Sequence, residues 1–308
     1  MSHNAMMNKK HTTSRMLRRE AIEGYLFVTP LLVGLIFFTA GPVLASLFIS
    51  FCKYNIFAPP QFVGMQNYAE LSRDPLFWKS LKITAIYSFI SVPLGLSLGL
   101  AVALLMNQKI KGIALFRTIY YLPAVVSGVA VALLWVWIFD PSYGLGNVVL
   151  KSLGLPTCQW LTSPRTALMS LIIMSFWGVG GGMVIYLAGL QSVPQHLYEA
   201  ASLDGANVLQ KFRHVTLPML TPVIFYNLIM GIIGSFQVFT QAFVMTNGGP
   251  VNSTLFYVLY LFRQAFNYYH MGYASAMAWV LFAIILALTL IVFKSSALWV
   301  YYEGERKK

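Results

Sequence analysis

Long apolar runs without any charged residue dominate the chain. Five of them, over residues 26–51, 83–106, 118–139, 166–190 and 273–293, each reach the ~20 residues that a helix needs to cross a bilayer. The uncharged interval 215–262 is too long for one span, but Asn247-Gly248-Gly249-Pro250 interrupts it. This predicts a helix over 217–245, then an outer loop with a short amphipathic segment. The runs lack the alternation of barrel strands, so the sequence predicts an all-α membrane protein with six transmembrane helices.

Basic residues are concentrated in every second connection. Segments 1–25, 107–117, 191–216 and 294–308 hold 14 Lys and Arg, and the three alternate loops hold 7. Because Lys and Arg favour the cytoplasmic side, both termini are predicted to be cytoplasmic. The predicted organisation is a tail (1–25), a six-helix domain (26–293) and a second tail (294–308).

The composition excludes a soluble enzyme and a disordered chain. Only 10% of the 308 residues are charged and 58% are hydrophobic, against roughly 25% charged in ordinary soluble domains. The net charge of +12 would favour nucleic acid in a soluble protein. In a membrane protein it is explained by basic cytoplasmic ends that touch anionic lipid, so no nucleic-acid partner is predicted. The spans contain no ionisable residue, which weighs against an ion-coupled secondary carrier.

Motifs for chemistry are missing from the sequence. There is no Gly-x-x-x-x-Gly-Lys phosphate loop, no His, Cys and carboxylate cluster with metal spacing, and no nucleophile beside an acid–base pair. We therefore expect no catalysis, no metal and no cofactor bound by this chain. The glycine run at 178–182 lies inside a span and indicates close helix packing or local unwinding. Cys52 and Cys158 both lie on the predicted outer side, where they could pair or stay free.

The cytoplasmic loop 191–216 has the pattern of a helical hairpin. Pro194 suits the first turn of a short helix and Gly205 suits its left-handed end, before a second short helix over 206–214. Small or short residues recur at helical spacing: Leu197, Ala200, Ala201 and Asp204. Such a face could dock closely in a groove, with Glu199 as an anion for a basic partner. The alternative is a solvated connection between two spans.

The same loop resembles the EAA loop of permease subunits in binding-protein-dependent ABC importers. The matching residues are Glu199-Ala200-Ala201, Gly205, Val215 (usually Ile in the pattern) and Leu217-Pro218. Further segments are similar to the carbohydrate-uptake branch, and within it to the first, maltose- and glycerol-3-phosphate-type permease: FVTPLLVGLIFFTAGPVLASLFISF (27–51), FVGMQNY (62–68), RTIYYLP (117–123) and TNGGPVNST (246–254).

The resemblance implies a type I ABC importer permease fold in a bacterial or archaeal plasma membrane. It implies a second permease subunit, two cytoplasmic ATPase subunits that bind ATP and Mg, and an extracytoplasmic solute-binding protein as partners. The residues implied as ATPase contacts are Glu199, Ala200, Ala201, Asp204 and Gly205. The transported solute would be a sugar or sugar-like compound, with glycerol-3-phosphate or another polyol derivative as the alternative.

The fifth predicted span carries a polar stripe. At 100° per residue, one arc of this helix collects Asn227, Gly231, Gly234, Gln237 and Gln241. Small residues and amides also occur at helix–helix contacts, so packing is one interpretation. The other is a wall of the substrate path, on which amides bind substrate hydroxyls and nearby aromatic rings, Trp177, Phe236 and Phe239, stack on sugar faces.

Overall fold

The computed structural model describes residues 3–301, with side chains from Met16 onward. Three of the basic residues in the predicted tail 1–25, Lys9, Lys10 and Arg15, therefore lie outside the described side chains. Its α-helices are α1 (His3–Leu35), α2 (Gly41–Ser50), α3 (Gln66–Arg73), α4 (Pro75–Met106), α5 (Ile113–Val125), α6 (Gly128–Ile138), α7 (Leu145–Ser152), α8 (Ala167–Ser175), α9 (Gly180–Ser192), α10 (Gln195–Leu203), α11 (Val208–Lys211), α12 (Leu217–Phe236), α13 (Tyr257–Phe262) and α14 (Met271–Trp299). The remaining elements are η1 (Ile36–Ala40), η2 (Trp160–Thr162), η3 (Phe176–Gly178), η4 (Phe212–Thr216), η5 (Ala242–Thr246), η6 (Arg263–Asn267), β1 (Cys52–Lys53) and β2 (Gln61–Phe62).

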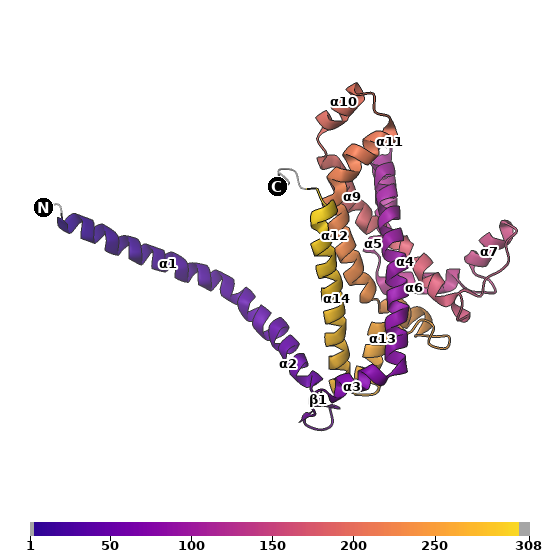
Figure 1. Ribbon diagram of the computed structural model, residues 1–308, viewed down its shortest axis with the longest axis horizontal. Helices are drawn as coiled ribbons and strands as arrows, with labels where there is room; N and C mark the ends of the chain where they lie inside the picture. The colour runs from indigo at the N-terminus through magenta and orange to yellow at the C-terminus, as the bar shows by residue number, and fades with distance from the viewer. Residues whose placement is uncertain (1–2, 302–308) are drawn as a thin grey trace.

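The helices give the predicted all-α membrane architecture. Four continuous helical stretches are long and apolar enough to cross a bilayer: Met16–Ser50, Pro75–Met106, Val208–Phe236 and Met271–Trp299. Two bent pairs, α5 with α6 and α8 with α9, complete six spans when each pair counts as one. The helix from Met16 to Ser50 leads away from the bundle, and its apolar window buries nothing against the rest of the described chain (Figure 1).

The third predicted span is not one straight helix. α5 and α6 are related by a bend of 99°. Val126 and Ser127 adopt extended backbone conformations between them, with ψ of 141° and 131°. Hydropathy is high on both sides of this bend, so the apolar pattern alone gave no sign of it.

The fifth predicted span ends earlier than expected. α12 stops at Phe236, the backbone leaves the helix at Gln237, and a short π-helix, η5, follows at Ala242. The continuous helix predicted over 217–245 was therefore wrong at 237–239, and helical backbone resumes at Thr240. The predicted amphipathic segment in the next loop is α13, which the bundle buries instead: Tyr257 and Leu259 have no exposed surface.

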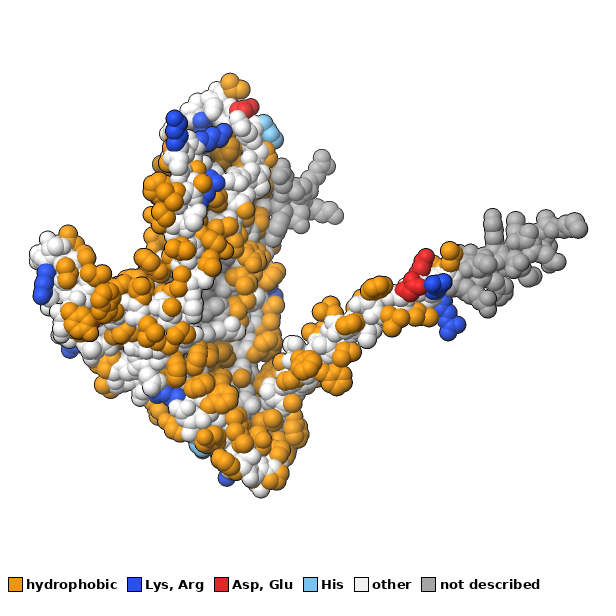
Figure 2. All heavy atoms as spheres, turned by 180° about the vertical axis from the view of Figure 1, so that it is seen from behind, with side chains coloured by type: hydrophobic (Ala, Val, Ile, Leu, Met, Phe, Trp, Pro, Cys, Tyr) orange, Lys and Arg blue, Asp and Glu red, His pale blue; other side chains and the backbone are white. Residues whose placement is uncertain are grey.

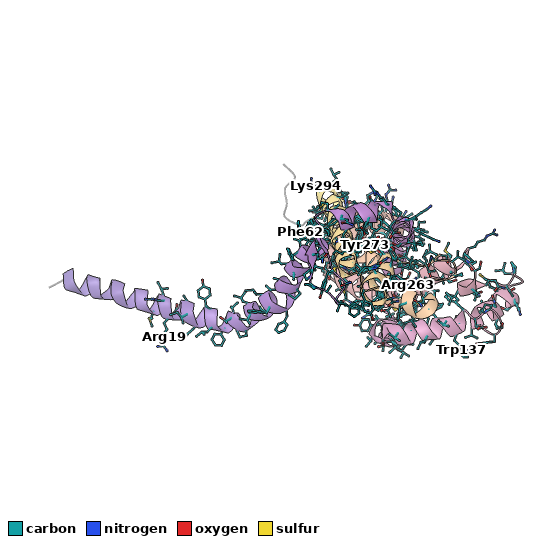
Figure 3. The ribbon with its side chains drawn as sticks, turned by 90° about the horizontal axis from the view of Figure 1, so that it is seen from below. Arg19, Phe62, Trp137, Arg263, Tyr273 and Lys294 are labelled. Atoms are coloured by element: carbon teal, nitrogen blue, oxygen red, sulfur yellow. The ribbon has the colours of Figure 1, made fainter. Side chains whose placement is uncertain are left out.

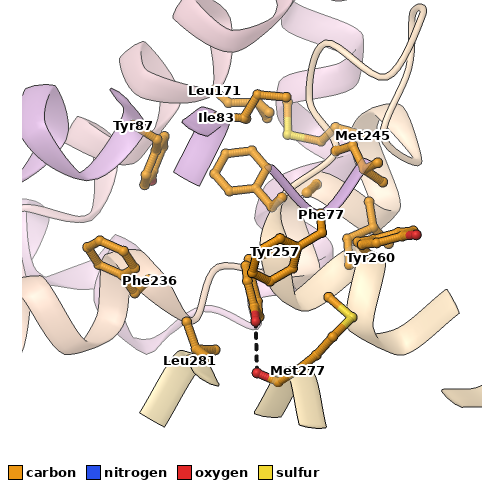
Figure 4. Close-up of a cluster of buried hydrophobic side chains, with 14 of the residues drawn as sticks. Phe77, Ile83, Tyr87, Leu171, Phe236, Met245, Tyr257, Tyr260, Met277 and Leu281 are labelled. Atoms are coloured by element: carbon orange, nitrogen blue, oxygen red, sulfur yellow. Dashed lines mark hydrogen bonds between the residues drawn. The ribbon is translucent and has the colours of Figure 1, made fainter. Parts of the chain in front are cut away.

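The main core joins α4, α13 and α14 (Figure 4). The Tyr257 hydroxyl donates to the Met277 carbonyl at 2.8 Å, and the Tyr257 N–H donates to Thr84 Oγ1 at 2.9 Å. These bonds satisfy polar groups among apolar side chains, where an unpaired group would be costly. The loop after the fifth span is thereby fixed against the helices on both sides of it.

The end of the bundle near α3 is closed by a short hairpin. β1 and β2 pair antiparallel, with Cys52 opposite Phe62. Asn67 Nδ2 donates to the carbonyls of Ser50 and Cys52 at 2.7 and 3.0 Å, which ties α3 to the end of the first span. Cys52 and Cys158 are both free.

Candidate functional site: a coupling loop and a central cavity

The loop 191–216 projects from the end of the bundle opposite to β1 and α3 (Figure 1). α10 begins after Pro194 and ends before Gly205, whose φ of +77° gives the left-handed turn expected from the sequence. The helix predicted over 206–214 is the shorter α11, which continues as the π-helix η4. Asn207 and Gln210 form a reciprocal capping box at its start, which fixes the turn between the two short helices.

Two side-chain bonds brace this hairpin against the spans. The hydroxyls of Tyr198 on α10 and Thr216 at the base of α12 lie 2.9 Å apart. Lys211 Nζ on α11 donates to Ser202 Oγ on α10 at 2.7 Å. These two bonds tie α10 to the base of α12 and to α11.

The outward surface of the hairpin is only partly the one predicted. Glu199, Ala200, Asp204 and Gly205 are exposed, whereas Ala201 is half-buried. Three apolar side chains that the sequence analysis did not select are among the most exposed in the described chain: Leu203 at 90%, Val208 at 86% and Leu209 at 73%. All three flank Gly205. The signal in the sequence that could have identified them was the occurrence of three apolar residues beside a predicted turn.

Several Lys and Arg side chains surround this end of the molecule, and hydrophobic side chains cover most of the bundle below it (Figure 2). The basic side chains there include Lys211 and the exposed Arg213, on the short helices that follow α10. This distribution is typical of a protein whose apolar belt contacts lipid and whose basic end faces water.

A cavity of about 460 Å³ lies between α4, the bent pair α8–α9 and α12. This central cavity has polar groups on all three sides, and no charged residue lines it. Its polar lining residues are Tyr87, Ser91, Ser175, Tyr186, Asn227, Ser235 and Gln241. The hydroxyls of Ser88 and Ser235 lie 2.6 Å apart and join α4 to α12.

Glycines allow the helices to meet around the central cavity. A Cβ at Gly231 on α12 would lie 3.1 Å from Val92 Cγ1 on α4, so the Val92 side chain would have to shift to admit a larger residue. At Gly182 on α9 an added Cβ would lie 3.5 Å from Asn227 Oδ1, which is an ordinary contact. Asn227 Nδ2 donates to the Val223 carbonyl at 2.9 Å, and Asn227 lines the central cavity.

The predicted path residues separate into two groups. Asn227 and Gln241 line the central cavity, together with Gly231 and Gly234. Four others do not: Gln237 is exposed elsewhere, Phe236 is buried in the core, Trp177 packs edge-on against Trp135, and Phe239 stacks on Phe243. The helix break at 237–239 takes Gln237 off the stripe that a continuous helix would form.

Tyr87, Ser91 and Ser175 complete the cavity from α4 and α8, and the sequence analysis missed them. Serines within long apolar spans were the available signal, because a hydroxyl in a membrane helix usually bonds to its own backbone or faces a polar space.

Residues 91–301 match the protein family described as "Binding-protein-dependent transport system inner membrane component". The chain belongs to this family. The matched region contains α10, α11 and most of the helices around the central cavity, so both parts of the site lie in the family's shared domain. The permease is therefore a multi-pass membrane protein, and the family inferred from the EAA loop is confirmed.

Relatives of this permease match along nearly the whole chain. It is 45% identical over 299 residues to "Probable ABC transporter permease protein YesP" of Bacillus subtilis (strain 168), covering 96% of each chain. It is 37% identical to "Trehalose/maltose transport system permease protein MalF" of Thermococcus litoralis, covering 92% of this chain and 96% of the relative. It is 34% identical to "Arabinooligosaccharides transport system permease protein AraP" of Bacillus subtilis, covering 88% of each.

The fold of this permease is also that of a solved importer. A chain of a bacterial ABC transporter involved in the import of the acidic polysaccharide alginate superposes with a TM-score of 0.80, 24% identity, and coverage of 93% of this chain and 98% of that one. At this identity the likeness establishes the type I importer permease fold, and the substrate has to be argued from this chain's own residues.

Proposed function

We propose that this chain is one of two permease subunits of an ATP-driven importer for a sugar or sugar-like solute. The observation that carries the proposal is the braced, exposed hairpin of α10 and α11 at one end of a bundle that has an uncharged polar cavity between α4, α8–α9 and α12. The chain itself catalyses no reaction. ATP and Mg bind to two partner ATPase subunits, and the permease converts their movement into opening and closing of the path.

The hairpin is suited to docking in a groove of a cytoplasmic partner. Exposed Leu203, Val208 and Leu209 supply apolar contact area, and Glu199 supplies an anion. Exposed apolar side chains at a water-facing end otherwise have no stabilising contact, which supports a protein partner there. It follows that this end, and with it both termini, faces the cytoplasm.

The central cavity suits a neutral, hydroxyl-rich solute. Hydroxyls and amides such as Ser91, Asn227 and Gln241 both donate and accept, as sugar hydroxyls do. A phosphate ester would require a cation, and no charged residue lines the cavity. The names of the relatives, for trehalose and maltose and for arabinooligosaccharides, agree with a carbohydrate. The same lack of charge disfavours an ion-coupled secondary carrier.

The remaining partners follow from the family and from the surface of the chain. A second permease subunit completes the path, and an extracytoplasmic binding protein delivers the solute. A solved relative of this fold was crystallised with an alginate pentasaccharide-bound periplasmic protein. The apolar helix from Met16 to Ser50 is available to contact the second subunit or lipid, because none of its apolar window is buried.

Reconstitution tests the proposal. The permease should co-purify with an ATPase subunit and a second permease, and the reconstituted complex should take up carbohydrate only with ATP and the loaded binding protein. Binding protein should stimulate ATP hydrolysis. Uptake by the lone chain in liposomes without ATP would contradict the proposal.

Gln241→Leu is expected to weaken uptake where Gln237→Leu does not. Gln241 lines the central cavity and Gln237 does not, although both are glutamines of the same connection. Loss of a hydrogen bond to a neutral solute costs about 1 kcal/mol, which corresponds to a roughly five-fold higher KM for transport. Uptake against solute concentration measures both variants. Equal KM values for the two variants would favour the other interpretation, in which these polar residues serve helix packing.

A further inference from the structure

A second and larger cavity, of about 710 Å³, lies at the end of the bundle opposite to the coupling hairpin. This outer pocket is formed by the segment after β1, by α3 and by the turn from η6 into α14. Figure 3 looks onto this end, where Tyr273 and Arg263 are labelled. It shares no residue with the central cavity, and its volume falls within the ~300–1,000 Å³ usual for small-molecule sites.

One wall of the outer pocket is held by a chain of hydrogen bonds. Asp74 Oδ2 accepts from the hydroxyls of Tyr260 at 2.5 Å and Tyr273 at 2.6 Å. Gln264 Nε2 donates to the Tyr260 oxygen at 2.7 Å, and Gln264 Oε1 lies 3.0 Å from His270 Nδ1. Four segments, α3–α4, α13, η6 and α14, are thereby locked into one surface before any ligand arrives.

Asp74 stays ionised within this wall. Burial alone would raise the pKa of its carboxyl, but the Tyr260 and Tyr273 hydroxyls and the N–H groups of Leu76 and Phe77 outweigh burial and lower it. Asp74 is also the N-cap of α4, accepting from the Leu76 N–H at 2.8 Å. Its bonding capacity is committed to the protein, so it shapes the pocket and leaves ligand contacts to its neighbours.

Those neighbours have groups with no partner among the described residues. The hydroxyls of Tyr54 and Tyr268, the Lys53 ammonium and Glu70 Oε2 make no hydrogen bond there, while Glu70 Oε1 accepts from Gln66 at 2.9 Å. The pocket thus offers unused donors and acceptors together with tyrosine faces. Planar polar groups that bind adjacent hydroxyls, with aromatic rings beside them, match the chemistry of a sugar ring.

The charge of the pocket selects against anions. Among the lining residues, the two carboxylates of Glu70 and Asp74 outnumber the single ammonium of Lys53. A phosphorylated or uronic ligand would meet a carboxylate without a matching cation.

We propose that the outer pocket is an accessory binding site for a neutral saccharide, separate from the central cavity. Only the choice of a saccharide as ligand rests on the proposed function. Such a site would hold solute at the extracytoplasmic end of the permease, on the side from which the binding protein delivers it. Glu70 and Tyr268 make the ligand contacts, and the Asp74 network positions them.

Saccharide binding to the purified complex in lipid nanodiscs, without ATP and without binding protein, tests the site. Maltose and trehalose serve as probes in saturation-transfer NMR, with glucuronate as the anionic comparison. Glu70→Ala and Tyr268→Ala should each weaken saccharide binding about ten-fold. Glu70→Ala removes a charged hydrogen-bond acceptor, and Tyr268→Ala removes a hydroxyl and an aromatic face on which the sugar can stack. Arg73→Ala on the same helix and Phe266→Ala, both exposed and outside the pocket, should leave binding unchanged.

The Gln241→Leu variant separates this site from the transport path. Saccharide binding that keeps its full affinity in Gln241→Leu and weakens about ten-fold in Tyr268→Ala supports the outer pocket. Absence of saturable binding, equal binding of glucuronate, or a Tyr268→Ala effect only on association of the binding protein would overturn it. The proposed function has its own readout, ATP-dependent uptake, so each proposal can fail while the other stands.

Discussion

Glu199→Lys and Gly205→Asp are each expected to reduce ATP-driven uptake by about 100-fold, while the chain remains inserted in the membrane at normal levels. Glu199 is exposed on the outward face of α10, so a lysine there changes no contact inside the described chain. It would reverse the charge offered to the ATPase groove. Gly205 has a φ of +77° and no neighbour within 4 Å of an added Cβ. An aspartate there strains the turn and adds a charge beside the apolar contact area.

Both losses should lie in coupling rather than in folding or solute binding. The bonds that brace the hairpin, Tyr198 to Thr216 and Lys211 to Ser202, do not involve either position. We therefore expect that binding protein no longer stimulates ATP hydrolysis in either variant. The complex should either keep its basal ATP hydrolysis or lose the ATPase subunits altogether. Uptake, stimulated ATPase activity and membrane content should be measured together.

Two matched variants serve as controls: one places a positive charge elsewhere in the same loop, and the other removes the charge of Glu199 without changing its shape. Gln191→Lys places a cation in the same loop but outside α10, at an exposed position, and should transport normally. Glu199→Gln keeps the shape of the side chain and should retain part of the activity. Normal uptake by Glu199→Lys would show that the hairpin is a solvated connection, the alternative that the sequence left open.

Apolar runs located the membrane helices correctly because burial in lipid constrains every residue of a span. The apolar runs could not show where a helix bends within a span. Val126 and Ser127 are compatible with a continuous helix by hydropathy, yet their extended backbone turns α6 by 99° from α5. Local turn chemistry was a better guide where it was strong: Gly205 has the positive φ that the sequence predicted.

The polar stripe predicted on the fifth span was only partly correct, for a related reason. Its angular spacing assumed a helix through Met245, and that holds only as far as Phe236. Asn227, Gly231 and Gly234 lie before the break and line the central cavity as a group. Gln241 lines it through a different local geometry, and Gln237 does not. Contributions from α4 and α8 depend on packing between distant segments, which no pattern within one span contains.

Gly180→Ala is expected to destabilise the permease by about 3 kcal/mol or to prevent its accumulation in the membrane. A Cβ on Gly180 would overlap the carbonyl oxygen of Tyr120 and lie 3.1 Å from the Cα of Tyr121. The obstacle is backbone of α5, which cannot rotate aside as a side chain can. α9 would have to withdraw from α5, and the neighbouring Val179 and Gly182, which line the central cavity, would move with it.

Adjacent glycines provide the controls. At Gly181 a Cβ would meet Ala124 Cβ at 3.8 Å, an ordinary contact, and alanine there should gain up to about 1 kcal/mol of helix stability. At Gly178 no atom lies within 4 Å of an added Cβ. Thermal unfolding in detergent and the amount of inserted chain should therefore drop for Gly180→Ala alone. If all three alanine variants behaved alike, the glycine run would serve helix flexibility rather than close packing. If Gly180→Ala alone failed, the contact between α5 and α9 would be what fixes the bent fourth span and, through Gly182 opposite Asn227, the width of the cavity.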